Sequence, residues 1–193
     1  MNIGLLGFGV VGGGVWELAQ EKRALNVKKV LVRREAPSLG KAAVQDVEAI
    51  LRDTEIDTVV EVLGGLHPAY EWICRALAAG KDVVTANKAV ISAYYRELTA
   101  LARENGVALR CTAAVGGGIP WLVNLQRCRR VDTVTEVGGI MNGTTNFIMD
   151  AMARQGADFP AVLQRAQELG YAEADPSADI DGDDIRRKLT ISA

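Results

Sequence analysis

The chain has 193 residues, of which 49% are hydrophobic and 24% are charged, and its formal net charge is −2. This length allows one large hydrophobic core or two modest ones. Because lysine and arginine are not in excess, the composition argues against nucleic acid or membrane partners and favours a small-molecule partner. The uncharged residues 3–16 are broken by glycines and end at Glu17, short of a membrane span, so we expect a cytoplasmic protein.

The three cysteines are odd in number and show no metal-type spacing. They also lie in apolar stretches of sequence. This favours buried, reduced thiols over disulfides at Cys74, Cys111 and Cys128.

The first dozen residues contain a glycine motif between a strand pattern and a helix pattern. An apolar run from Ile3 leads into Gly7-x-Gly9-x-x-Gly12, and helical spacing follows to Ala24. In a dinucleotide-binding unit these glycines permit a tight turn, an approach to the pyrophosphate and close helix packing, and the helix N-terminus favours the phosphates. A buried glycine-rich hairpin or a membrane-inserting segment is the alternative, but the strand and helix on either side favour dinucleotide binding.

Two arginines follow the second expected strand, Val27 to Val32. Arg33 and Arg34 lie about twenty residues past the glycine motif, where an NAD-preferring site would place an acid. Arginine there favours the 2′-phosphate of NADP, although the neighbouring Glu35 weakens this argument. Two solvated arginines at a strand end are the structural alternative.

Strand and helix patterns alternate as far as residue 111. The sequence predicts helices and strands in turn over Val44 to Leu51, Thr58 to Leu63, Pro68 to Ala79, Asp82 to Thr85, Ser92 to Glu104 and Val107 to Cys111. This alternation predicts an α/β fold with a doubly wound parallel sheet, a Rossmann-type dinucleotide-binding domain. Two expected segments at strand carboxyl ends, where ligands collect, contain Gly64 and the stretch Ala86-Asn87-Lys88.

A glycine run at 116–118 marks the expected domain boundary, which gives a dinucleotide-binding domain over 1–120 and a second domain over 121–193. In the second domain we expect a helix, a strand of a second sheet, a helix capped by Thr144 and a further helix. Their expected ranges are Pro120 to Cys128, Val131 to Met141, Thr144 to Arg154 and Pro160 to Leu169. The second domain is therefore predicted to be a partial α+β substrate domain.

An acidic segment follows Gly170 and leads into a helix. Its spacing does not fit a calcium-binding EF-hand loop, because a glycine interrupts the acids and no glutamate closes the loop. Lys188 lies one helical turn beyond Asp184 on the same face. A solvated ion pair worth about 0.2 to 0.5 kcal/mol is one interpretation. The other is a site in which carboxylates hold an ammonium group and the lysine supplies a proton to a reacting carbonyl.

Six segments in order resemble homoserine dehydrogenase. They are Gly7-Phe8-Gly9-Val10-Val11-Gly12, Val60 to Gly65, Thr85-Ala86-Asn87-Lys88-Ala89, Val115-Gly116-Gly117-Gly118-Ile119-Pro120, Gly139 to Ile148, and Gly170-Tyr171-Ala172-Glu173 through Lys188-Leu189. The resemblance implies NAD(P)H-dependent interconversion of aspartate 4-semialdehyde and L-homoserine, in threonine and methionine biosynthesis. It also implies a homo-oligomer, a dimer if the chain is complete enough. Within this NAD(P)H dependence, the two arginines lead us to expect that NADP is preferred over NAD.

The resemblance assigns roles to individual residues. Lys188 would be the proton donor, Lys88 would lie between cofactor and substrate, and the substrate-binding residues would be Glu173, Asp179 and Asp184. The expected cofactor-binding residues are Gly7, Phe8, Gly9, Val10, Val11, Gly12, Arg33, Arg34, Gly64, Thr85 and Lys88. A sodium ion would be bound by the backbone carbonyls of Thr112, Val115, Gly117 and Ile119.

The chain departs from the family pattern in two ways. It has Cys111-Thr112-Ala113 where the family usually has Tyr-Glu-Ala, so an acid is missing beside the cation loop. Family members also continue past the last helix, so we expect the second domain to be incomplete. The alternatives to the enzyme are a non-catalytic dinucleotide-binding protein and another Rossmann-type amino-acid dehydrogenase.

Overall fold

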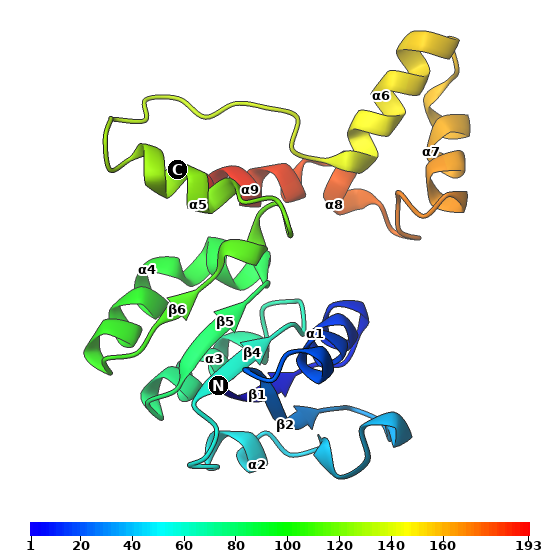
Figure 1. Ribbon diagram of the computed structural model, residues 1–193. Helices are drawn as coiled ribbons and strands as arrows, with labels where there is room; N and C mark the ends of the chain where they lie inside the picture. Colours follow the sequence, from blue (N-terminus) through cyan, green and yellow to red (C-terminus); the bar gives the residue numbers. More distant parts are fainter. The chain divides into compact units, whose positions relative to one another are not determined.

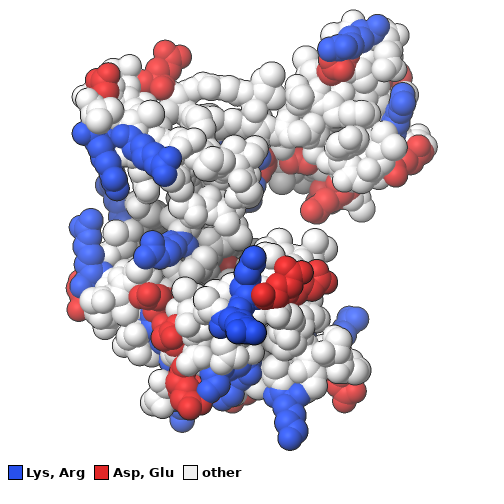
Figure 2. All heavy atoms as spheres, in the orientation of Figure 1, with Lys and Arg blue, Asp and Glu red and all other residues white.

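The computed structural model describes all residues, 1–193, and the chain divides into two compact units, Met1–Trp121 and Leu122–Ala193 (Figure 1). No helix in the chain has both the length and the apolar composition needed to cross a membrane. On the face shown in Figure 2, acidic and basic side chains are interspersed over the first unit and do not form a patch of one sign.

The first unit is built on a six-stranded sheet in the order β3-β2-β1-β4-β5-β6 (Figure 1). All five neighbouring pairs are parallel. The strands are β1 (Asn2–Leu6), β2 (Asn26–Leu31), β3 (Ala43–Val44), β4 (Thr58–Glu61), β5 (Asp82–Thr85) and β6 (Leu109–Arg110). The strand order reverses between β1 and β4, and this leaves a crevice at the carboxyl ends of the strands. The expected doubly wound parallel fold is confirmed.

Helices connect these strands, and the sheet centre is closed to solvent. The helical elements are α1 (Val10–Glu21), η1 (Pro37–Ala42), α2 (Glu48–Leu51), α3 (Ala69–Ala78), α4 (Lys88–Glu104) and η2 (Thr112–Ala114). Leu5, Val30, Val59 and Val83, one from each of the four central strands, are fully buried. Burial on both faces explains the apolar residues at the centres of β1, β4 and β5, whereas β2 also contains Lys28 and Lys29, which are only partly buried.

Two boundaries in the first unit differ from the prediction. The helix expected over Val44 to Leu51 is only one turn long, and the short strand β3 precedes it. Helix α4 begins at Lys88 instead of Ser92, because the Asn87 side chain accepts a hydrogen bond from the Val90 amide and caps the helix.

The second unit is helical. Its helices are α5 (Trp121–Cys128, whose first residue closes the first unit), α6 (Gly143–Gln155), α7 (Phe159–Glu168), α8 (Ser177–Ile180) and α9 (Asp183–Ser192). A small apolar core joins α6 to α7 and is formed by Ile148, Ala151, Val162, Ala166 and Ala172.

The strand expected over 131–141 does not form, and these residues adopt neither helix nor strand. Val131 and Ile140 are 87% and 81% exposed. An isolated strand has no partner for its backbone N–H and C=O groups, so an alternating pattern forms a strand only where another strand pairs with it.

Two smaller predictions in this part of the chain were also wrong. Asn142 caps α6, because its side-chain oxygen accepts from the Thr145 amide at 2.8 Å, whereas Thr144 is buried inside the first turn. All three cysteines are free, but Cys128 is exposed and is not a buried thiol.

Candidate functional site

The three glycines of the first turn have three different environments. Gly7 has a φ of +107°, a conformation that residues with side chains rarely adopt. A Cβ on Gly12 would lie 2.2 Å from the carbonyl oxygen of Gly7, so only glycine lets α1 pack this closely. At Gly9 a Cβ would meet nothing within 4 Å, so the turn is open on that side. These are the backbone properties that a dinucleotide-binding turn requires.

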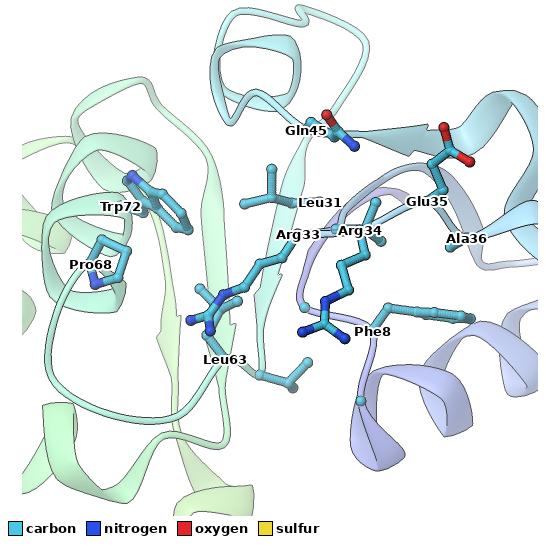
Figure 3. A pocket seen from close by; sticks show the side chains of 14 residues that line it. Phe8, Leu31, Arg33, Arg34, Glu35, Ala36, Gln45, Leu63, Pro68 and Trp72 are labelled. Atoms are coloured by element: carbon cyan, nitrogen blue, oxygen red, sulfur yellow. The ribbon is translucent and has the colours of Figure 1, made fainter.

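A cavity of about 810 Å³ lies at the carboxyl edge of the sheet in the first unit (Figure 3). Its walls come from the β1–α1 turn and from the segments that follow β2 and β4. The lining residues are Gly7, Phe8, Gly9, Leu31, Val32, Arg33, Arg34, Glu35, Ala36, Gln45, Val62, Leu63, Pro68 and Trp72. The cavity therefore occupies the switch point where doubly wound sheets bind their ligands.

Both expected arginines line this cavity and are exposed. Figure 3 shows the Arg33 side chain extending toward Leu63 and the Arg34 side chain toward Phe8, while the Glu35 carboxylate points away from both guanidinium groups. Two guanidinium groups from which the neighbouring carboxylate points away suit an anionic ligand group.

The other expected cofactor residues do not line the cavity. Gly12 supports the turn, and Val10 and Val11 lie in α1. Gly64 lies in the loop after β4, Thr85 is the last residue of β5, and Lys88 is the first residue of α4. Sequence reasoning missed Gln45 and Trp72, because they come from separate segments and become neighbours only in the folded sheet.

A buried carboxylate lies beside the cavity at the end of β4. Glu61 is fully buried, and its oxygens accept hydrogen bonds from the Leu63 amide (2.8 Å), the Thr85 hydroxyl (2.5 Å) and the Asn87 side chain (3.3 Å). Glu61 is an acid inside the apolar run Val59 to Leu63, and an acid in such a run is the sequence signal for a buried carboxylate.

The second unit brings three of its predicted site residues together. The Asn142 amide donates to Asp179 at 2.7 Å and to Asp184 at 3.0 Å, and the Thr144 hydroxyl lies 2.9 Å from the second oxygen of Asp179. The Lys188 ammonium lies 2.7 Å from the same oxygen of Asp184 and donates to the carbonyl of Met141. We call these five residues, Asn142, Thr144, Asp179, Asp184 and Lys188, the acidic cluster.

Glu173 has a different environment from the acidic cluster. It is exposed, and its backbone carbonyl accepts a hydrogen bond from the Gln167 side chain at 3.1 Å. Its carboxylate therefore faces solvent, and the substrate-binding role assigned to it stays a prediction.

The glycine run that was expected to bind a cation is a tight turn. Gly116 and Gly117 have positive φ values, and the Ile119 carbonyl accepts a hydrogen bond from the Trp121 amide at 2.7 Å. Burial raises the pKa of the nearby Cys111 thiol, so this group stays neutral. No group of three or more His, Cys, Asp or Glu side chains could hold a metal ion. The cation site expected at the backbone carbonyls of this turn stays a prediction.

Comparison with known proteins adds independent findings. A family model described as "Homoserine dehydrogenase, NAD binding domain" matches residues 7–112, and one described as "Homoserine dehydrogenase" matches residues 120–193. The chain is 45% identical to a homoserine dehydrogenase of Synechocystis and 39% identical to one of Bacillus subtilis. Both alignments cover all of this chain, and they cover 47% and 48% of the length of the two relatives. It thus spans about half the length of these curated relatives.

Solved structures agree with these matches. A homoserine dehydrogenase from Thiobacillus denitrificans superposes with a TM-score of 0.93 at 41% identity, over 99% of this chain and 47% of that one. A hyperthermophilic archaeal homoserine dehydrogenase in complex with NADPH gives a TM-score of 0.87 at 28% identity, over 98% and 67% of the two chains. Since both family models and whole-chain relatives agree with the glycine turn and the strand order, the chain belongs to the homoserine dehydrogenase family.

Proposed function

We propose that this chain interconverts aspartate 4-semialdehyde and L-homoserine with a nicotinamide dinucleotide as the redox partner. The main support for this proposal is the ion pair between Asp184 and Lys188, whose side chains are only 12% and 18% exposed. The same chain has a dinucleotide-type glycine turn in its first unit. A cluster that contains two carboxylates and a lysine suits a substrate that has both an ammonium group and a carbonyl group.

The residues of the first unit fit a dinucleotide. The turn from Gly7 to Gly12 and the N-terminus of α1 would hold the pyrophosphate, and the open space at Gly9 leaves room for it. Arg33 and Arg34 would bind a 2′-phosphate, so we propose that NADP is preferred over NAD. When bound in its reduced form, the cofactor supplies a hydride to the substrate carbonyl.

The side chains of the acidic cluster would orient the substrate and supply the proton. Asn142 and Thr144 hold Asp179, and Asn142 also holds Asp184, so both carboxylates have fixed directions. Asp179 and Asp184, with the exposed Glu173, would attract the substrate ammonium group. Lys188 would donate its proton to the carbonyl oxygen as negative charge develops there, and would then be reprotonated from solvent.

Three further roles belong to this proposal. Lys88, the first residue of α4, would lie between cofactor and substrate. A sodium ion would be held by backbone carbonyls in the turn formed by Thr112, Val115, Gly117 and Ile119, and loss of activity in sodium-free buffer would test it.

A homodimer is supported by exposed apolar side chains in the second unit, such as Ile140 and Met149, and sedimentation would test it.

The test is turnover by the purified chain. Oxidation of NADPH with aspartate 4-semialdehyde, and reduction of NADP⁺ with L-homoserine, should both be measurable. Lys188→Met should lower kcat by at least about 100-fold, which is the usual size of a general-acid contribution. Arg186→Met is the matched control, because Arg186 is exposed on the same helix and pairs with Asp183; its kcat should stay within about twofold of wild type.

Other outcomes would contradict the proposal in distinct ways. Binding of NADPH without turnover would indicate a dinucleotide-binding protein without catalytic activity. Turnover only with other amino-acid substrates would indicate a different dehydrogenase.

A further inference from the structure

Glu61 connects the loops that follow β4 and β5. A buried carboxylate is unfavourable unless hydrogen bonds replace its hydration, and Glu61 accepts three. The Leu63 amide belongs to the loop after β4, whereas the Thr85 hydroxyl and the Asn87 side chain belong to the end of β5 and the loop after it. One side chain therefore binds two loops that are far apart in sequence.

Asn87 makes a second set of bonds between the same loops. Its backbone amide donates to the Thr85 hydroxyl oxygen at 2.9 Å, and its side-chain amide donates to the Gly65 carbonyl at 2.7 Å. Its side-chain oxygen accepts from the Val90 amide and caps α4, which begins at Lys88. The position of Lys88 thus depends on the same network as the loop at Gly65.

The network lies on the side of the sheet where the second half of a dinucleotide would be expected. The arginines follow β2, on one side of β1, while β4 and β5 lie on the other side. If the pyrophosphate lies at the β1 turn and the adenosine half lies near Arg33 and Arg34, the nicotinamide half extends toward β4 and β5. Leu63, whose backbone amide donates a hydrogen bond to the Glu61 carboxylate, also lines the cavity.

We propose that Glu61 is a positioning residue that acts through Thr85 and Asn87 to hold the two loops forming the nicotinamide side of the site. This inference rests on the proposed function, because it assumes that the cavity binds a nicotinamide dinucleotide. The network holds the backbone on which Lys88 is placed, and it does not itself contact the reacting atoms.

Hydrogen exchange in the unliganded chain tests the coupling without any cofactor. Thr85→Val removes one hydroxyl and nearly preserves volume. It should speed exchange of the Asn87 amide, which loses its acceptor, and also exchange at residues 63–65 in the other loop, each by about tenfold. Thr99→Val is the matched control, because the Thr99 hydroxyl is buried and has no hydrogen-bond partner, and it should leave both loops unchanged. Faster exchange at Asn87 alone would overturn the coupling.

Ligand binding tests the placement. The chain should bind both NADPH and adenosine 2′,5′-bisphosphate, which lacks the nicotinamide half. Thr85→Val and Glu61→Gln should weaken NADPH binding by about tenfold and leave the fragment within twofold, whereas general destabilisation would weaken both equally. Equal effects on the two ligands, or none, would overturn the inference. A wild-type chain that binds neither ligand would overturn the proposed function, and the inference would fall with it.

Discussion

Asp184 and Lys188 form an ion pair of 2.7 Å on one face of α9, and 12% and 18% of their side chains are exposed. The same helix carries an exposed pair, Asp183 and Arg186, with 47% and 68% exposed. Two carboxylate–cation pairs with nearly the same spacing thus have different environments. The two pairs differ because the inner pair has further hydrogen-bond partners. The Asn142 side chain donates to Asp184, and the Met141 carbonyl accepts from Lys188.

Removing one member of the inner pair should destabilise the chain. Lys188→Met leaves the Asp184 carboxylate partly desolvated without its counter-ion, so we expect a loss of about 1 to 3 kcal/mol in the free energy of unfolding. The double variant with Asp184→Leu should recover part of that loss, giving a coupling of at least about 1 kcal/mol in urea unfolding. The same cycle on Asp183 and Arg186 should give less than about 0.5 kcal/mol. Equal couplings for both pairs would contradict the difference in burial.

Gly12 should not tolerate alanine. The new Cβ would lie 2.2 Å from the Gly7 carbonyl oxygen, which is backbone and cannot rotate away. We expect Gly12→Ala to lower the free energy of unfolding by about 1 to 3 kcal/mol and to weaken NADPH binding. Gly14→Ala is the control in the same helix, because its Cβ meets nothing within 4 Å. It should stabilise the chain by about 0.4 to 1 kcal/mol, and similar results for the two variants in thermal unfolding would contradict the close packing.

The fold of the first unit could be predicted because its signals are local. Apolar runs and helical spacing, punctuated by glycine, indicate most of the strands and helices of this unit. The strand expected over 131–141 failed for the opposite reason, since strand formation depends on a pairing strand that the pattern does not supply. The two-residue strand β3 was missed because so short a segment has no readable period.

The candidate site could be predicted in part for a similar reason. The i,i+4 spacing indicated the contact between Asp184 and Lys188, because both lie on one helix. The contacts of Asn142 with Asp179 and Asp184 span 37 and 42 residues, and no local pattern indicates them. The pair Asn142-Gly143 is typical of a turn, but Asn142 is both a helix cap and the amide that joins the two carboxylates.

Lys81 should make stability depend on pH in the alkaline range. Its side chain is buried, its ammonium group donates to the carbonyls of Asp53 and Ile56 at 2.7 Å, and burial lowers its pKa below the ordinary 10.5. Below the folded-state pKa both states are charged and the burial penalty is present in full. As pH rises from there toward 10.5, the folded state loses its proton first and the penalty disappears.

The free energy of unfolding of wild type minus that of Lys81→Met should therefore increase as the pH rises toward 10.5 in urea titrations. A constant difference for Lys81→Met would show that its amine titrates alike in both states.

Arg33 and Arg34 should set the preference between the two cofactors. Both line the cavity, and a charge-assisted hydrogen bond from either to a 2′-phosphate is worth about 1.5 to 3 kcal/mol. Arg33→Ala and Arg34→Ala should each raise the Kd for NADPH by about tenfold or more and change the Kd for NADH by less than about twofold. Arg23→Ala, an exposed arginine of the same unit, controls for the change in net charge and should leave the ratio of the two Kd values unchanged. If this ratio is also unchanged in both cavity variants, the arginines are solvated side chains at a strand end and the cofactor preference has another origin.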